Sequence, residues 1–349
     1  METNRRQAGK NGSTIKNAAP GLRRDSAPPA WPSFTGQSQS VGTSPSGRVT
    51  VFVDPSLGDA GLQNAQDLLA DADRVANAND SIFGTVGGPV SVVIFALGGV
   101  TDGTGGADHG GCDYSSGAAI EVCASFGNSA RVSALFEAEL SECSMGGNLC
   151  GVSTGEALSR WCASVIGNDA LSDFATAPTW FQDGMPDYVN QTDPTDQNAD
   201  STGCGMAFIS WLLSQGITLE SIAQGMVSLG DVGTLAQLYA SLTGDVQSNA
   251  LPAFAAAVQS LPGGVTSDDP FGGAVQPAQM AHIAPWTVAL AGKVFAAILS
   301  DIAASKEPHQ ILASVRAALA SRPPSRVGRL ARSECAVGSR RLRPPQANR

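Results

Sequence analysis

The order of strand-like and helix-like segments limits what this chain can fold into more than any other feature. Segments typical of strands, such as Arg48 to Asp54 and the β-branched run from Pro89 to Gly99, all come before residue 128. The second run is continuously apolar, as in a central strand that is buried. From Arg131 onward the apolar residues recur with the period of a helix. Strands followed by helices predict an α+β domain.

The individual segments predict a mixed sheet with one helix, followed by a mainly helical subdomain. Residues 59–84 have the apolar spacing of a long helix that ends near Asn79, and residues 110–127 are typical of a hairpin with Ser-Ser-Gly at its turn. Further helices are expected at 131–143, 154–166, 202–215, 219–227, 232–242 and 247–260.

Charge divides the chain into three blocks. Residues 1–46 carry a net charge of +4, residues 47–273 carry −22 and residues 274–349 carry +8. A surface as acidic as that of the middle block excludes nucleic acid as a partner. Arginine- and proline-rich tails ordinarily stay solvated, so the basic ends do not change this conclusion.

Composition also sets the expected domain boundaries. The ends are poor in periodic apolar residues, which predicts disorder. A strongly apolar helix is expected at 285–305, but Lys293 and Asp301 argue against a membrane span and favour docking. The expected parts are a disordered tail (1–46), a zincin-like domain (47–273) with a sheet-rich half (47–128) and a helical half (129–273), a linker with the docking helix (274–321) and a disordered basic tail (322–349).

The cysteines favour an oxidising compartment. Six of the seven lie in the acidic block, and this even number is compatible with three disulfides whose pairing stays open. No C-x-x-C pair is present, which argues against a cysteine zinc site. This cysteine-bearing, lysine-free block is typical of a secreted, extracytoplasmic protein, although residues 1–46 contain no apolar run suited to a signal peptide.

The helix expected at 131–143 carries a carboxylate in the middle of its apolar face. Glu139 interrupts the stripe, and Glu142 follows one turn later on the same side. A buried charge is costly unless it is paired, so either both acids reach the rim of the core or they have a function. In the next helix Ser153 and Glu156 have the spacing of a capping box, with Arg160 as the i,i+4 partner of Glu156.

These two helices resemble a known pair. AELSE (Ala138 to Glu142) followed by GEALSR (Gly155 to Arg160) is similar to the paired helices of the thermolysin-like metallopeptidases, the gluzincins. In that family the first helix carries H-E-x-x-H and the second N-E-x-x-S-D, and zinc is held by the two histidines and the second glutamate. PTWFQDGMPDYV (Pro178 to Val189) resembles a further segment that carries a metal-binding glutamate in related peptidases. The resemblance covers roughly residues 90–260.

The resemblance implies a role for each matching position. Glu139 matches the general base, and Glu156 matches the third zinc ligand, with Asp183 as its rival. Ala138 and Glu142 stand where the family has its two zinc-binding histidines. Alanine has no ligand atom, so zinc is not expected at the usual positions.

The remaining charges suggest how the acids are compensated. The acidic block contains one histidine, His109, which is a further candidate metal ligand. Arg160 is expected to supply the positive charge that zinc supplies in the relatives, by pairing with Glu142 or Glu156. A degenerate zinc site favours a non-catalytic role, as a scaffold or in binding a peptide or protein ligand.

Two other activities stay open. The first is a working metal-dependent peptidase or hydrolase that uses Glu142, Glu156 and either His109 or Asp183, whose oxygen atoms favour Ca²⁺, Mg²⁺ or Mn²⁺. The second is a serine hydrolase, because Gly151 to Gly155 (GVSTG) matches G-x-S-x-G.

An acidic loop at 193–203 is a candidate calcium site. Hard cations prefer oxygen-rich loops, although clusters of Asp and Asn also form ordinary turns. Its candidate ligands are Asp193, Asp196, Asn198 and Asp200. The sequence leaves the identity of any cofactor, the substrate and the oligomeric state open.

Overall fold

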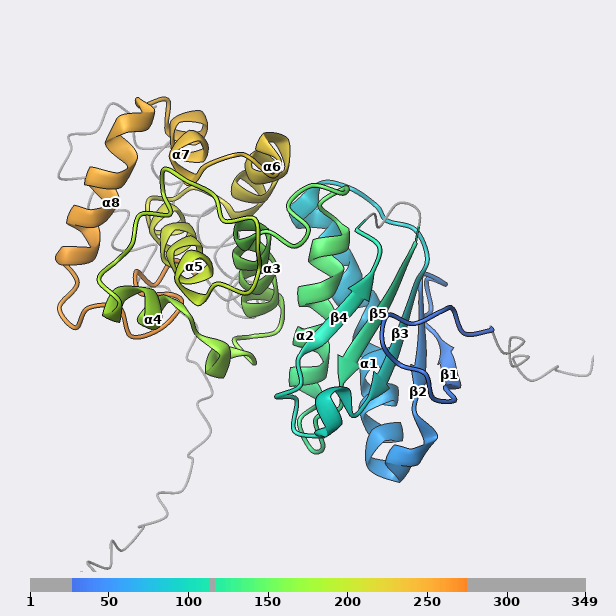
Figure 1. The fold of residues 1–349 in the computed structure, drawn as a ribbon. Coiled ribbons are helices and arrows are strands. Elements are labelled where there is room, and N and C mark those ends of the chain that lie inside the picture. The colour runs from blue at the N-terminus through green and yellow to red at the C-terminus, as the bar shows by residue number, and fades with distance from the viewer. Residues whose placement is uncertain (1–26, 113–116, 275–349) are drawn as a thin grey trace, which may run out of the picture. The chain divides into compact units, whose positions relative to one another are not determined.

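The computed structural model describes residues 27–112 and 117–274, with the strands in the first part and most helices in the second (Figure 1). All of these residues belong to one compact unit, Met1–Met280. The sheet and helix α1 (Gly58–Phe83) precede residue 124, and only helices follow as regular elements. The α+β class predicted from the order of the segments is therefore confirmed.

The strands form one mixed sheet in the order β1-β2-β3-β5-β4. The inner strands β2, β3 and β5 are parallel, and each edge strand is antiparallel to its neighbour. Helix α1 connects β2 to β3, as parallel neighbours require. The predicted hairpin is confirmed as β4 and β5, which leaves β4 at an edge. The bounds are β1 (Gln39–Thr43), β2 (Val49–Val53), β3 (Val90–Phe95), β4 (Ala107–Gly110) and β5 (Ala118–Cys123).

One face of the sheet packs on α1 and α2 (Ser129–Cys143) (Figure 1). Strand side chains alternate between the two faces, so every second residue of the inner strands enters this core. Most are β-branched residues, which suit a pleated and buried surface. They are Val49, Val51, Val53, Val90, Val92, Ile94, Ala118, Ile120 and Val122.

The other face is covered in part by the segment that precedes β1, which corrects the predicted disordered tail at 1–46. The Trp31 ring packs edge-on against Phe52, with 5.4 Å between their centroids, and the Phe34 N–H donates to the Glu121 carboxylate at 2.6 Å. Strand β1 also lies inside the expected tail. Composition missed both because a strand rich in Ser and Gly pairs through its backbone, and because two aromatic residues suffice to anchor the segment. Residues 1–26 lie outside the described part.

The six helices predicted after residue 130 are all present, and a short helix, α4, was not predicted. Helix α5 lies at the centre of this half, and its Phe208 and Trp211 pack on Phe254 of α8, which in turn stacks on Trp180 of α4. Besides α2, the bounds are α3 (Ser153–Ile166), α4 (Ala177–Gln182), α5 (Ala199–Ser214), α6 (Leu219–Leu229), α7 (Leu235–Thr243) and α8 (Ala250–Gln259).

The cysteines differ from the prediction of three disulfides. Within residues 27–112 and 117–274 one disulfide is formed, between Cys112 and Cys150. The other four are buried thiols, and buried thiols pack as small apolar side chains. They are Cys123, Cys143, Cys162 and Cys204.

The predicted docking helix at 285–305 and the basic tail at 322–349 lie outside the described residues. Among the helices of the described part, none combines the length and the apolar character that crossing a membrane requires.

Candidate functional site

A cleft of about 820 Å³ lies between the edge strand β4 and helices α2 and α3. The loop that precedes β4 and the segments around residues 174 and 198 complete its walls. Six of the residues singled out from the sequence line this one cleft: His109, Glu139, Glu142, Glu156, Arg160 and Asp196. The structure thus brings together most of the predicted site.

Strand β4 contributes backbone as well as side chains to the cleft. The Cys123 N–H donates to the Gly106 carbonyl at 3.0 Å, and Ala107 lies opposite Val122 in the register of the hairpin. In an antiparallel ladder, hydrogen-bonded pairs alternate with pairs that are not hydrogen-bonded. Because Gly106 is hydrogen-bonded to Cys123, the N–H and C=O of the next residue, Ala107, point away from β5. Since Ala107 lines the cleft, β4 presents there an edge that a further strand can pair.

Helix α2 places Glu139 where its apolar stripe meets the cleft. Val132, Phe136 and Leu140 are fully buried in the core, whereas Glu139 is partly exposed and lines the cleft with Ala138. The stripe is therefore divided, and its acidic position does not have to enter the core. Glu139 thus lies at the rim of the core, one of the two explanations that the sequence left for both acids, whereas Glu142 is buried.

Glu142 pairs with His109, which comes from β4. The His109 Nε2 lies 3.0 Å from Glu142 Oε2, and the Ser159 hydroxyl lies 3.2 Å from the other carboxylate oxygen. Burial opposes protonation of His109, but hydrogen bonds to Cys143 and Glu142 outweigh it and raise the pKa of His109 to about 11. The cation beside Glu142 is thus the imidazolium of His109, which lies on the edge strand itself.

The other two glutamates are acids of raised pKa. Burial first, and then the charge of Glu142, raise the pKa of Glu156 to about 8, although Arg160 lowers it. Burial and the same neighbour also hold the pKa of Glu139 well above its ordinary value. A cation bound beside either carboxyl group would favour its ionised form.

The pairing expected for Arg160 is wrong. Arg160 forms its ion pair with Asp268, at 3.2 Å, and also donates to the Phe174 carbonyl and the Thr176 hydroxyl. Within the described residues no ion pair links it to Glu142 or Glu156. Its side chain instead contacts residues 174–176, which follow α3, and Asp268 also accepts the Thr176 N–H there. Only its longer-range charge reaches Glu156.

Ser153 is neither the helix cap nor the nucleophile that the sequence suggested. Helix α3 is capped at Val152 without a side-chain bond, so the predicted capping box is wrong. The Ser153 hydroxyl is 2 % exposed and its nearest acceptor is the Asp193 carbonyl, at 3.4 Å. The residues before it form turns rather than a strand, and His109 is engaged with Glu142. This arrangement is not a nucleophile elbow.

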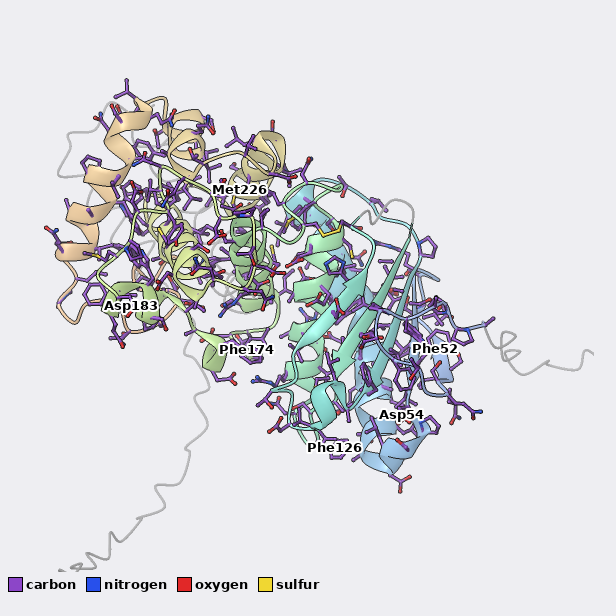
Figure 2. The ribbon with its side chains drawn as sticks, in the orientation of Figure 1. Phe52, Asp54, Phe126, Phe174, Asp183 and Met226 are labelled. Carbon is purple, nitrogen blue, oxygen red and sulfur yellow. A yellow bond between two sulfur atoms is a disulfide. The ribbon has the colours of Figure 1, made fainter. Side chains whose placement is uncertain are left out.

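The calcium site predicted at 193–203 stays a prediction, and Asp183 lies apart from the cleft. Asp183 is exposed after α4 (Figure 2), does not line the cleft and lies close to Asp200, whose pKa is raised by burial and by this second acid. Asn198 caps α5 by accepting the Asp200 N–H, and it donates to Asp193 at 2.6 Å. Asp193 and Asn198 thus form local turns, which was the alternative explanation, whereas the buried Asp200 Oδ1 has no hydrogen-bond partner among the described residues.

Zinc at the gluzincin positions does not fit these residues. Ala138 stands at the first histidine position without a donor atom, and Glu142 at the second is already paired with His109. In the described ranges one group of side chains is compact enough to hold a metal ion, and it is a different one, His109, Cys112 and Cys150. Its cysteines are 38 residues apart, so no spacing rule revealed it.

A buried hydroxyl in the cleft also escaped sequence analysis. Thr202 of α5 is 1 % exposed, lines the cleft, and its hydroxyl has no hydrogen-bond partner among the residues that the structure describes. Buried polar groups are nearly always paired, so this unpaired hydroxyl beside the cleft is an exception.

Comparisons with protein families, with curated proteins and with solved structures gave no match. The resemblance to the gluzincins therefore stays a prediction.

Proposed function

We propose that this chain is a gluzincin-like protein without the zinc site of that family, and that its cleft binds an extended peptide segment. The observation that carries the proposal is the free edge of β4, which borders a cleft lined by Glu139, Glu142 and Glu156. An extended peptide adds to such an edge through main-chain hydrogen bonds, and the pockets beside the edge select its side chains.

The arrangement of the two motif helices supports the resemblance on which this proposal rests. AELSE lies on α2 and GEALSR on α3, and these helices pack against each other. Their acids line one cleft, as the paired helices of the family would require. The alanine at position 138 supports the loss of zinc rather than its retention.

The charges of the cleft favour a basic ligand. Asp108, Glu139, Glu156 and Asp196 line it, and the only basic side chains among them, His109 and Arg160, are each engaged by an acid. A lysine or arginine side chain placed beside Glu139 would favour its ionised form and pair with it, whereas an acidic peptide would be repelled by Asp108 and Asp196.

Fluorescence anisotropy with short labelled peptides and the full chain tests the proposal. A peptide with alternating Arg and Val should bind at least about tenfold more tightly than its counterpart with Glu in place of Arg. Backbone N-methylation at alternate residues should abolish binding, because it removes the main-chain donors. Glu139→Gln should weaken binding, and Asp59→Asn, at an exposed position on α1, is the matched control. Equal binding of the acidic and basic peptides would refute the proposal.

The active metal-dependent hydrolase stays an alternative because three of its candidate ligands, His109, Glu142 and Glu156, line one cleft. The same basic peptide, incubated with Mn²⁺ or Ca²⁺ and followed by mass spectrometry, distinguishes the two functions. Cleavage that depends on the cation and is lost in Glu139→Gln would replace the binding role with catalysis.

A further inference from the structure

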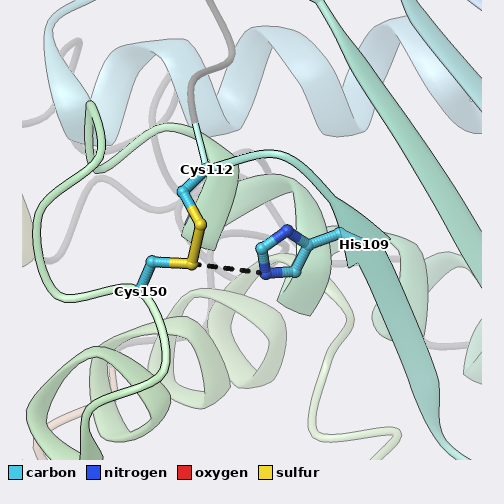
Figure 3. A group of neighbouring side chains, drawn as sticks. All are labelled: His109, Cys112 and Cys150. Atoms are coloured by element: carbon cyan, nitrogen blue, oxygen red, sulfur yellow. Dashed lines mark hydrogen bonds between the residues drawn. A yellow bond between two sulfur atoms is a disulfide. The ribbon is translucent and has the colours of Figure 1, made fainter. Parts of the chain in front are cut away.

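A histidine and a disulfide meet at the end of β4, close to Glu142. His109 Nε2 lies 4.0 Å from Cys150 Sγ, and Cys150 is bonded to Cys112 (Figure 3). The ring nitrogen and the two sulfur atoms all lie within 4.8 Å of one another. Both cysteines are partly exposed, so a reductant in solution can reach the bond.

We propose that reduction of this disulfide creates a zinc site formed by Cys112, Cys150 and His109. Two thiolates and an imidazole are a ligand set that zinc prefers. With Zn–N of about 2.0 Å and Zn–S of about 2.3 Å, a tetrahedral ion separates nitrogen from sulfur by about 3.6 Å. The observed 4.0 Å between His109 and Cys150 needs a shift of less than half an ångström. The larger movement is that of the two sulfur atoms, which must separate to about 3.8 Å once their bond is reduced.

The surroundings already orient the ligands. His109 Nδ1 lies 3.0 Å from the Gly111 carbonyl, and as the donor it directs Nε2 toward the cysteines, which is how metal-binding histidines are usually held. The Gly147 N–H donates to the Cys112 carbonyl at 2.7 Å, so the two loops stay joined when the disulfide opens. Glu142 Oε2, 3.0 Å from Nε2, is placed to become the fourth ligand.

The chemistry balances with a dithiol as the reductant. The dithiol gives two electrons and two protons to the disulfide, forms its own disulfide and leaves Cys112 and Cys150 as thiols. Zn²⁺ then displaces the two thiol protons and the proton on His109 Nε2. The inference does not depend on peptide binding, because none of its ligands is required to contact a peptide.

Cobalt substitution tests the site in the full chain. Co²⁺ added to dithiol-reduced, desalted protein under argon should give the thiolate-to-cobalt charge-transfer band and the visible bands of a tetrahedral ion, at one Co²⁺ per chain. Zn²⁺ should remove these bands, and the oxidised protein should show none. Reduced protein without a thiolate band would overturn the proposal.

Variants identify the ligands. Cys112→Ser and Cys150→Ser should each lose most of the band, and His109→Gln should weaken Co²⁺ binding by about tenfold or more. Cys335→Ser, outside the described residues, and Cys204→Ser, buried in α5, are the matched controls and should keep it. A band that survives in both Cys112→Ser and Cys150→Ser would place the metal elsewhere. Circular dichroism of each variant confirms that a lost band does not reflect unfolding.

Discussion

Replacing Glu137 with methionine should stabilise the fold, and the gain should grow with pH. Glu137 is fully buried on α2, and neither carboxylate oxygen has a hydrogen-bond partner in the part of the chain that the structure describes. Helical spacing puts it with Ser133 and Ser141 on the side of α2 away from Val132 and Phe136, yet α1 and α3 pack against α2 and this face is buried as well. Burial raises the pKa of Glu137 well above its ordinary value, while the charge of Arg74 opposes this rise.

The sign of the pH dependence follows from this raised pKa. In the unfolded chain Glu137 ionises above its ordinary pKa of about 4.3, whereas the folded protein keeps it neutral to higher pH. Wild-type stability is therefore fullest below that value and falls by about 1.4 kcal/mol per pH unit above it, until the folded-state pKa is passed. A buried polar group without a partner costs about 1–3 kcal/mol in addition. Methionine, of similar volume, removes both effects.

Urea unfolding followed by tryptophan fluorescence measures the effect. At about pH 5 Glu137→Met should raise the free energy of unfolding by about 1–3 kcal/mol, and the gain should be larger at about pH 8. Glu137→Gln should remove the pH dependence with a smaller gain, because the amide is still unpaired. Glu220→Gln, at an exposed position on α6, is the matched control. A Glu137→Met variant that is destabilised and keeps the wild-type pH dependence would refute the reasoning, since the loss of stability with pH would then not arise from Glu137.

Two further predictions concern the ion pair and the disulfide. A double-mutant cycle between Arg160→Ala and Asp268→Ala should give a coupling of about 1–3 kcal/mol in urea unfolding, whereas Arg160→Ala with Glu142→Gln should couple by less than about 0.5 kcal/mol. A larger coupling energy between Arg160 and Glu142 than between Arg160 and Asp268 would restore Arg160 as the partner of Glu142. Reducing the disulfide, which joins residues 38 apart, should lower the free energy of unfolding by up to about 4 kcal/mol. No change in the urea midpoint on reduction would show that the bond is not formed in solution.

Local patterns predicted the fold well because its elements are strongly periodic. The β-branched run at 90–95 has no alternative to a buried strand, and the apolar spacing of α1 continues over 26 residues. Strand β1 has neither feature. It is held by backbone pairing with β2, and Thr43 lies opposite Thr50, a contact that only the tertiary fold creates.

The site was predicted in its residues but not in its pairing. Helical spacing places Glu139 and Glu142 on one side of α2, and this required no tertiary information. Which cation meets Glu142 depends on where β4 returns beside α2, and sequence spacing contains no sign of that contact. Arg160 was the nearer candidate along the chain, and Asp268, more than a hundred residues later, was invisible to local reasoning.

The position of His109 on β4 links the ion pair of the cleft to its free strand edge. The residue that neutralises Glu142 belongs to the same strand whose edge is free, and Ala107 lies two positions before it on that strand. A peptide that pairs with Ala107 would therefore run past the His109–Glu142 pair toward Glu139 and Glu156. Those two acids have no ion pair with a basic side chain in the described ranges, so the side chains of a basic ligand meet them rather than Glu142. Selectivity for basic peptides should accordingly depend on Glu139 and Glu156, while Glu142 mainly holds His109 and the edge strand in place.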